Sequence, residues 1–275
     1  MRIATRGSAL ALAQATWVAE RLDPPAELVP IVTSGDRRRA VDDKREWVLE
    51  LEEALLRGDA DLAVHSAKDV PVERPDALAL VAAPPRADPR DALCGAESLD
   101  ALPEGARVGT SSLRRIAQLR ARRPDVEVVE VRGNVDTRLR KLADGEVDAL
   151  ILAAAGLERL GRLGEAGALL DFVPAAGQGT LMVEARAGDI TAREALAHLR
   201  DEPTQLSLAT ERAVVAALGA DCRSAVGVHA EGTRVRAFVG AVDGSRWIAD
   251  EVEGEEGAAE LASRLLAVGA QELLR

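Results

Sequence analysis

One stretch of the sequence gathers several chemically active side chains directly after a short apolar run. Residues 59–71 read DADLAVHSAKDVP, and the apolar triplet Leu62–Val64 is typical of a short buried strand. The polar residues that follow the triplet are His65, Ser66, Lys68 and Asp69. Pro71 then prevents a regular continuation. Ligand crevices form at the carboxyl ends of strands in open α/β sheets, so this segment is a candidate site; taken alone, an ordinary solvated loop is the alternative.

Asp69 is the best candidate in this stretch for an acid, a base or a charge-stabilising group. Among lysines and arginines its carboxyl group would keep a low pKa and stay ionised. An ionised carboxylate is better suited to stabilising a developing cation than to donating a proton. The alternative is a loop aspartate that pairs with a neighbouring basic residue.

Two further segments place small hydroxyl residues between an expected strand and an expected helix, with arginine close by. They are TRGSAL at 5–10 and GTSSLRR at 109–115. A helix N-terminus offers unpaired backbone N–H groups, and arginine adds a bidentate donor for carboxylate or phosphate. Helix capping with solvated arginines is the alternative for either segment alone. Together they predict facing walls of an anion-binding cleft, built from Arg6, Ser8, Thr110, Ser111, Ser112, Arg114 and Arg115.

A third candidate anion site lies in the segment Val131–Leu139, VRGNVDTRL. Gly133 permits a tight turn after Arg132, and Arg138 falls in the first turn of the helix that follows. A cation is unfavourable at that end of a helix, and a bound anion would offset the cost. Arg159 comes after another apolar strand, so it too belongs near the carboxyl end of a strand.

Charge and composition exclude several classes of protein. The net charge of −11 argues against a general nucleic-acid binder, although a local cationic cleft for a small anion remains compatible with it. His65, His198 and His229 are far apart, and no Cys/His spacing fits zinc, so we expect no metal site.

The ends and the cysteines of the chain indicate a cytoplasmic protein. Arg2, Arg6 and the stretch 9–15 loosely resemble a signal peptide, but Gln14 interrupts the apolar run and Ser8 fits a helix N-cap better. No apolar run has the length of a membrane span, which is about 18 residues. Two cysteines are too few for a disulfide framework.

Cys222 lies in the small-residue loop GADCRS at 219–224. Beside an arginine on such a loop, a thiol can be exposed and partly ionised, and therefore nucleophilic. A small buried hydrophobic residue is the alternative, and it is favoured for Cys94, whose neighbours are apolar.

The alternation of expected strands and helices predicts βαβ units with largely parallel sheets. The strands expected in this part lie at 2–5, 28–32, 62–64, 78–82, 108–110, 126–131 and 149–153. From Thr204, a plausible N-cap, a helix is expected to 218, followed by antiparallel strands and a terminal helix. We therefore predict domain 1 over 1–85 with 178–201, domain 2 over 86–177, and a small α+β domain 3 over 202–275.

The chain closely resembles the porphobilinogen deaminase (hydroxymethylbilane synthase) family. The matching motifs occur in family order: TRGSALALAQ (5–14), TSGD (33–36), DLAVHSAKDVP (61–71), GTSSLRR (109–115), VRGNVDTRL (131–139), LAAAGLERL (152–160), AAGQG (175–179) and ERA…LGADC (211–222). The resemblance implies two α/β domains like those of type II periplasmic binding proteins, flanking a cleft, plus the α+β domain. It also implies a monomer.

The resemblance implies a transferase that joins four porphobilinogen molecules head to tail into a linear tetrapyrrole and releases ammonia each time. The family builds on a covalently bound dipyrromethane primer, and Cys222 matches the cysteine that holds it by a thioether. Asp69 matches the catalytic aspartate. The residues implied for the cofactor are Lys68, Ser8, Thr110, Ser111, Ser112, Arg114, Arg115, Arg132 and Gly133. Those implied for the substrate are Arg6, Arg138, Arg159, Trp47, Lys44 and Gln178.

The sequence departs from the family pattern in three places. Arg223-Ser224-Ala225 follows the cysteine where Gln-Val-Pro is common, and Ala67 replaces a frequent Met. Lys44 and Trp47 stand at the family's Lys and Phe positions, but the glycines around them are lost.

Two other functions are compatible with parts of the pattern. A non-catalytic anion-binding module would share the fold, but it would need neither Asp69 nor Cys222. A phosphate-ester enzyme could use the same arginines, but carboxylate clusters for a metal are not evident. Tetrapyrrole synthesis is the function we expect.

Overall fold

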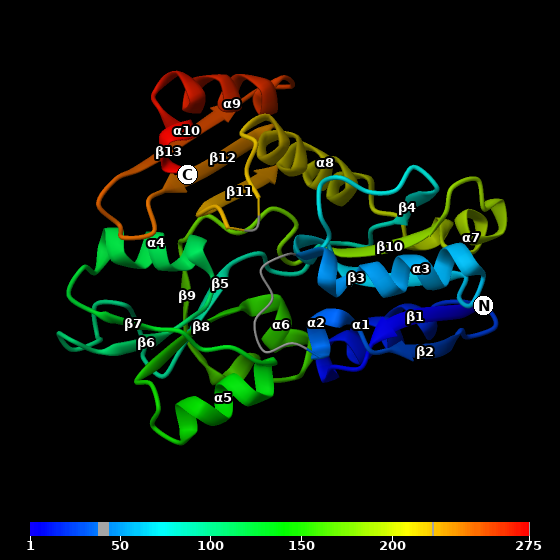
Figure 1. Ribbon diagram of the computed structural model, residues 1–275, viewed down its shortest axis with the longest axis horizontal. Helices are drawn as coiled ribbons and strands as arrows, with labels where there is room; N and C mark the ends of the chain where they lie inside the picture. Colours follow the sequence, from blue (N-terminus) through cyan, green and yellow to red (C-terminus); the bar gives the residue numbers. More distant parts are fainter. Residues whose placement is uncertain (38–43, 222, 275) are drawn as a thin grey trace. The chain divides into compact units, whose positions relative to one another are not determined.

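The computed structural model describes residues 1–37, 44–221 and 223–274. The chain divides into two compact units (Figure 1). Unit 1 comprises Met1–Ala87 with Gly179–Leu208, and unit 2 comprises Asp88–Gln178 with Ala209–Arg275. No helix in the described ranges is long and apolar enough to cross a membrane.

Unit 1 is built on a five-stranded sheet in the order β2-β1-β3-β10-β4. The strands are β1 (Arg2–Arg6), β2 (Glu27–Ile31), β3 (Leu62–Ser66), β4 (Leu78–Ala82) and β10 (Leu181–Arg186). β1 pairs in parallel with β2 and β3, whereas β10 runs antiparallel to both β3 and β4. Four strands therefore share one direction and β10 alone is reversed.

Helices cover both faces of this sheet because successive strand residues point to opposite faces. Helix α1 (Ala9–Ala19) packs Ala15 and Val18 against Ile3 and Leu62. On the other face, α3 (Leu49–Arg57) packs Leu51 and Leu55 against the neighbouring strand residues Ala4 and Ala63. The shorter helices of the unit are α2 (Ser34–Arg37), α7 (Ile190–Ala195) and 3₁₀ turns at Lys44–Trp47, Ala67–Asp69 and Ala197–Leu199.

Unit 2 repeats the same strand pattern in a second five-stranded sheet, β7-β6-β8-β5-β9. The strands are β5 (Asp91–Cys94), β6 (Arg107–Gly109), β7 (Glu127–Val129), β8 (Ala149–Ala153) and β9 (Ala166–Leu170). Here β5 is the reversed strand, antiparallel to β8 and β9. Helix α4 (Leu113–Arg122) packs on one face through Leu119, and α5 (Val135–Ala143) packs on the other through Leu139. The short helix α6 (Ala154–Arg159) and a 3₁₀ turn at Leu163–Glu165 follow β8.

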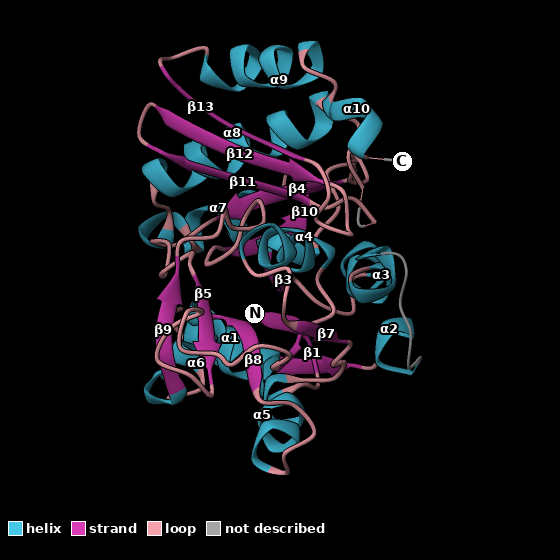
Figure 2. Cartoon of the chain, turned by 90° about the vertical axis from the view of Figure 1, so that its left-hand side faces the viewer, coloured by secondary structure: helices cyan, strands magenta, loops and turns pink. Residues whose placement is uncertain are grey.

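The last sheet of the chain is three-stranded and antiparallel, β11-β12-β13 (Figure 2). Its strands are β11 (Val226–Glu231), β12 (Arg234–Gly240) and β13 (Trp247–Glu253), and its helices are α8 (Glu202–Ala217), α9 (Gly257–Ala267) and α10 (Ala270–Leu273). Val214 of α8 and Leu261 of α9 share one apolar cluster with Val228 and Val235. Since the sheet has a core of its own, we propose residues 202–275 as a third domain.

The predicted α/β fold class is confirmed, with two five-stranded mixed sheets that carry helices on both faces and a separate antiparallel sheet. Strands β5, β9 and β10 were not predicted. The predicted cap of α8 is wrong, because the helix begins at Glu202 and the Asp201 carboxylate accepts from the Thr204 N–H at 2.9 Å. The Thr204 hydroxyl instead accepts from the Arg86 N–H at 3.1 Å.

Candidate active site

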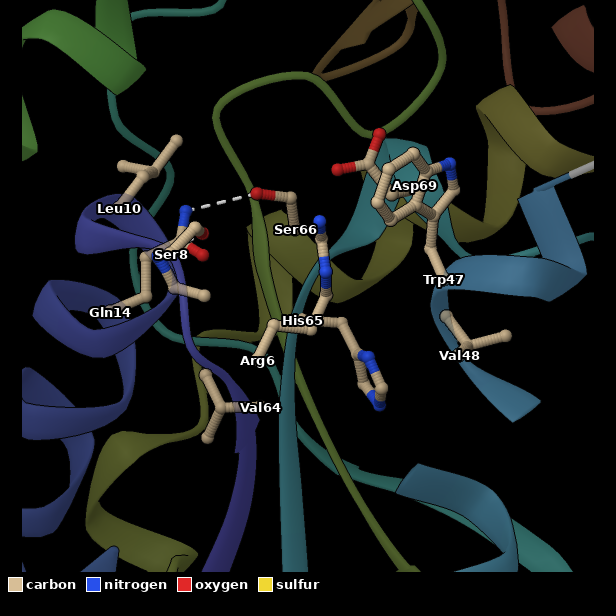
Figure 3. Close-up of a pocket in the computed structure, with 11 residues that line it drawn as sticks. Arg6, Ser8, Leu10, Gln14, Trp47, Val48, Val64, His65, Ser66 and Asp69 are labelled. Carbon is tan, nitrogen blue, oxygen red and sulfur yellow. Dashed lines mark hydrogen bonds between the residues drawn. The ribbon is translucent and has the colours of Figure 1, made fainter. Parts of the chain in front are cut away.

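A pocket in unit 1 lies at the carboxyl ends of β1 and β3 (Figure 3). It is lined by Arg6, Ser8, Leu10, Ala11, Gln14, Trp47, Val48, Val64, His65, Ser66 and Asp69. Four of the predicted site residues thus line one cavity, although they are spread over residues 6–69 of the sequence. They are Arg6, Ser8, Trp47 and Asp69.

Asp69 is positioned by the chain reversal that follows β3. The strand ends at Ser66, and a 3₁₀ turn over Ala67–Asp69 carries the aspartate to the pocket, which Trp47 also lines (Figure 3). Ala67 is buried and its N–H donates to the Thr180 carbonyl at 3.0 Å, which anchors the turn to the sheet. Within the described residues, no donor satisfies the Asp69 carboxylate. The group is therefore available to a donor from a ligand.

Arg6 is the last residue of β1, and two side chains fix its guanidinium. Its Nη2 and Nε donate to the Asp36 carboxylate, the latter at 3.4 Å. Its Cζ lies 3.9 Å from the centroid of a Trp47 ring, a cation–π contact. Burial raises the pKa of Asp36, but the hydrogen bond and charge of Arg6 outweigh that effect and hold the pKa below its ordinary value. Arg6 thus carries its positive charge next to an ionised partner.

Ser8 and Gln14 shape the side of the pocket formed by α1. Ser8 is the N-cap of the helix, as predicted, and its Oγ accepts from the Ala11 N–H at 3.3 Å. The buried amide of Gln14 donates to Ser66 Oγ at 2.9 Å. This bond joins α1 to the end of β3, so the two walls of the pocket are held in register.

A cluster of polar side chains around the buried Glu184 carboxylate lies on the α3 face of the sheet. His65 Nε2 is 3.2 Å from Glu184 Oε2, and Arg74 Nη1 donates to the other oxygen of Glu184 at 3.2 Å. Burial raises the pKa of Glu184, but the contacts with His65 and Arg74 lower it by a larger amount. The pKa is therefore below its ordinary value, and the carboxylate is ionised. The pKa of buried Glu52 is raised, first by desolvation and then by the charge of Glu184.

In unit 2, one buried carboxylate organises three of the predicted site residues. Arg114 Nη1 and Nη2 donate to Asp91 at 2.7 and 3.1 Å, and Arg115 Nε donates to it at 2.9 Å. Gln178 Nε2 donates to the same carboxylate at 2.9 Å. Asp91 has no exposed surface, and its three partners are also buried. Burial raises the pKa of Asp91, but the two arginines more than compensate and keep it ionised.

The remaining predicted residues of unit 2 lie at the carboxyl ends of β6, β7 and β8. Arg132 pairs with Glu130 at 2.7 Å, and Arg138 Nε donates to the Gly133 carbonyl at 2.7 Å. Gly133 has φ +116°, a conformation that favours glycine. At Arg159, the last residue of α6, desolvation lowers the guanidinium pKa to about 10.

The hydroxyl segment 110–112 precedes α4. Thr110 Oγ1 accepts from the Ser112 N–H at 3.3 Å, and Ser112 occupies the N-cap position without a side-chain cap bond. Ser111 and Ser112 are half-buried. In unit 1, Lys68 is half-buried beside Asp69 in the 3₁₀ turn. Cys222 and the side chain of Lys44 lie outside the described part of the chain.

A family profile described as porphobilinogen deaminase, dipyromethane cofactor binding domain, matches residues 1–194. The porphobilinogen deaminase of Trichlorobacter lovleyi is 43% identical over 297 residues, which cover 100% of this chain and 95% of that protein. The chain belongs to the porphobilinogen deaminase family. The porphobilinogen deaminase of Roseiflexus sp. is 48% identical over 261 residues, or 88% of this chain and 86% of that protein.

Solved structures give a more distant similarity. Immunogenic lipoprotein A from Vibrio vulnificus is 15% identical to this chain, with a TM-score of 0.47 over 75% of this chain and 97% of the lipoprotein.

Two residues that were not predicted from the sequence bear directly on the arginines of the candidate site. Asp36 pairs with Arg6, and its only sequence signal is its place in the TSGD motif. Asp91 pairs with Arg114 and Arg115 but precedes them by 23 and 24 positions, at the start of a strand that was itself missed. No local pattern marks it.

Proposed function

We propose that this chain deaminates four porphobilinogen molecules and condenses them head to tail into hydroxymethylbilane, as a transferase of tetrapyrrole biosynthesis. The observation that carries the proposal is the pocket of unit 1, in which an Asp69 carboxylate without a described partner shares one cavity with the Arg6 guanidinium. Those two groups match the two recognition features of the substrate, a pyrrole N–H and acidic side chains. Membership of the family supplies the reaction.

The same residues fit a dipyrromethane. The Ser8 hydroxyl suits its carboxylates, and Asp69 suits its pyrrole N–H groups. When bound through a thioether to Cys222, the cofactor supplies the electron-rich pyrrole carbon to which substrate is joined. The residues proposed to hold it are Lys68, Ser8, Thr110, Ser111, Ser112, Arg114, Arg115, Arg132 and Gly133.

Asp69 is the proposed catalytic residue. Loss of ammonia from the protonated aminomethyl group of porphobilinogen leaves an azafulvenium cation, whose charge extends to the pyrrole N–H. A fixed carboxylate that accepts this N–H stabilises the cation as it forms. Asp69 also orients the ring, and after the new carbon–carbon bond forms we propose that it accepts the proton lost from the attacking pyrrole carbon.

The cationic residues counter the charge of the growing chain. Each pyrrole unit brings two carboxylates, so the product is a polyanion and needs several cations despite a net charge of −11. The residues proposed to receive substrate are Arg6, Arg138, Arg159, Trp47, Lys44 and Gln178. Arg159 fits this role because desolvation lowers the pKa of its half-buried guanidinium to about 10, and a carboxylate partner is held more strongly in such a site than in water.

We further propose that the protein acts as a monomer in the cytoplasm on a small-molecule substrate, without nucleic acid or membrane as a partner. The acidic net charge supports the absence of nucleic acid.

The intact mass of the purified protein tests the proposal, beside the masses of Cys222→Ser and Cys94→Ser variants. Cys94 is the matched control, because burial raises the pKa of its thiol to about 11 and leaves it unsuited to alkylation. We expect an excess mass of two linked pyrroles in the wild type and in Cys94→Ser, and none in Cys222→Ser. A wild type that carries no added mass and forms no product from porphobilinogen would overturn the proposal.

A further inference from the structure

The segment Thr33–Arg37 holds one carboxylate in a fixed orientation. Asp36 Oδ2 accepts from the Thr33 N–H at 3.2 Å and from Thr33 Oγ1 at 2.9 Å, while the Asp36 N–H donates back to Thr33 Oγ1 at 3.2 Å. Thr33 is fully buried, so this small ring of hydrogen bonds is anchored in the protein. The direction of the Asp36 carboxylate is therefore set by the backbone before any ligand binds.

The same segment also contacts Trp47, which precedes α3, and Glu50 in the first turn of α3. The Ser34 N–H donates to Glu50 Oε1 at 2.7 Å, and Ser34 Oγ bonds the same oxygen. Gly35 lies directly against the indole of Trp47, since a Cβ at this position would meet ring carbons at 2.5 and 2.6 Å. Trp47 and Asp36 thus form a single support.

This support fixes Arg6 on two sides. The indole of Trp47 covers one face of the guanidinium at 3.9 Å. The Asp36 carboxylate takes the edge formed by Nε and Nη2. No described residue accepts a hydrogen bond from Nη1, and Arg6 lines the pocket with Asp69 (Figure 3). The Nη1 donors of Arg6 therefore remain for a ligand in the pocket, and the guanidinium that carries them is held in one orientation.

We propose that Asp36 is a positioning residue, which holds the Arg6 guanidinium so that its Nη1 edge receives a carboxylate of porphobilinogen. The inference rests on the proposed function of the pocket. A free arginine side chain loses rotamer entropy when it binds a ligand, and an arginine already held by a carboxylate and an indole has lost it beforehand. Asp36 therefore acts through Arg6 and need not touch the substrate.

Steady-state kinetics of the cofactor-loaded enzyme test this role with Asp36→Asn, Arg6→Met and the double variant. We expect Asp36→Asn to raise KM for porphobilinogen by about tenfold, with a smaller change in kcat, because hydrogen bonds to charged groups contribute on this scale. In the Arg6→Met background the same substitution should have no further effect on KM. Equal fold-changes in both backgrounds, or an unchanged KM in Asp36→Asn, would overturn the proposal.

Asp61→Asn is the matched control, because Asp61 binds Arg2 at the other end of β1, with an Asp61 Oδ2 to Arg2 N distance of 2.8 Å. Its KM should equal that of the wild type. If Asp36→Asn does not fold, Thr33→Val removes the 2.9 Å hydroxyl bond and should raise KM in the same direction, and an unchanged KM would contradict the role.

Binding of porphobilinogen, followed by tryptophan fluorescence, separates the two proposals. A wild type that binds porphobilinogen without turning it over would contradict the proposed function, and a weaker affinity of Asp36→Asn would still support the positioning role. An active wild type with an equally tight-binding and equally active Asp36→Asn would overturn the positioning role alone.

Discussion

His65 Nε2 lies 3.2 Å from Glu184 Oε2, and both side chains are buried, with His65 also lining the pocket. Neighbouring strands bring them together, since Met182 of β10 stands opposite His65 of β3 and Glu184 stands opposite Ala63. Arg74 holds the second carboxylate oxygen. The reversed strand β10 is therefore joined to the strand that carries the Asp69 turn through a buried charge as well as backbone hydrogen bonds.

Replacement of Glu184 by Gln should destabilise unit 1 by about 3 kcal/mol at neutral pH, because it removes the fully buried carboxylate that Arg74 and His65 contact. The pKa of Glu184 is lowered in the folded state, so its contribution is complete above the ordinary value of 4.5 and is lost as pH falls through the folded pKa. Urea denaturation at pH 7 and at pH 4 measures this. The difference between variant and wild type should shrink in acid, and a difference independent of pH would contradict the assignment. Glu53→Gln, in an exposed pair with Arg57, is the control with little expected effect.

Glu52 should show the opposite sign. Its pKa is raised by desolvation and by the charge of Glu184, so its ionisation opposes folding, and that cost grows as pH rises from about 4.5 through the folded pKa. We expect Glu52→Gln to melt above the wild type at pH 7 and to approach it at pH 4. Melting temperatures of the variant and the wild type at pH 7 and pH 4 test this. A variant that melts below the wild type at pH 7 would show that the ionised carboxylate stabilises the fold.

Much of the fold could be predicted because most parallel strands are apolar runs followed by a capped helix. Ser8 illustrates this, since it was expected to cap α1 and it does. Strands β5 and β10 escaped prediction because each is the reversed member of its sheet, and its partners are distant in sequence. The sheet position of such a strand depends on tertiary pairing rather than on a local signal.

Pocket residues such as Arg6 and Asp69 could be predicted because a recognisable motif follows the end of a strand. The residues that hold these side chains in place were harder to predict. Asp36 is 30 positions from Arg6, and only folding shows that its carboxylate faces that guanidinium. A polar residue in a turn has the same sequence signal whether it is solvated or holds a functional side chain, so support of this kind is visible only in three dimensions.

Asp91 should be far more important for stability than an exposed acid with equally short hydrogen bonds. Asp91→Asn leaves two buried guanidiniums without a counter-charge, and we expect a loss of about 3 kcal/mol or more in the free energy of unfolding. Asp148→Asn is the matched control: Asp148 binds Arg107 at 2.8 Å, but its side chain is 42% exposed, so the expected loss is below about 1 kcal/mol. Chemical denaturation of both variants makes the comparison. Equal losses of unfolding free energy in the two variants would mean that burial does not strengthen the interaction of Asp91 with Arg114 and Arg115.

Asp69→Asn should separate catalysis from assembly of the site. The amide keeps the size of the side chain but removes the negative charge, so the cation formed on loss of ammonia is no longer stabilised and turnover should fall by roughly 100-fold or more. Because no described residue donates to Asp69, the fold should be unaffected, and the mass of the attached primer should be retained.

Glu73→Gln, at an exposed acid four positions further on, is the control and should keep wild-type turnover. Product formation from porphobilinogen and intact mass are the two measurements. Near-normal turnover of Asp69→Asn would remove the aspartate from the chemistry, whereas loss of turnover together with loss of the primer would place its role in attachment of the cofactor.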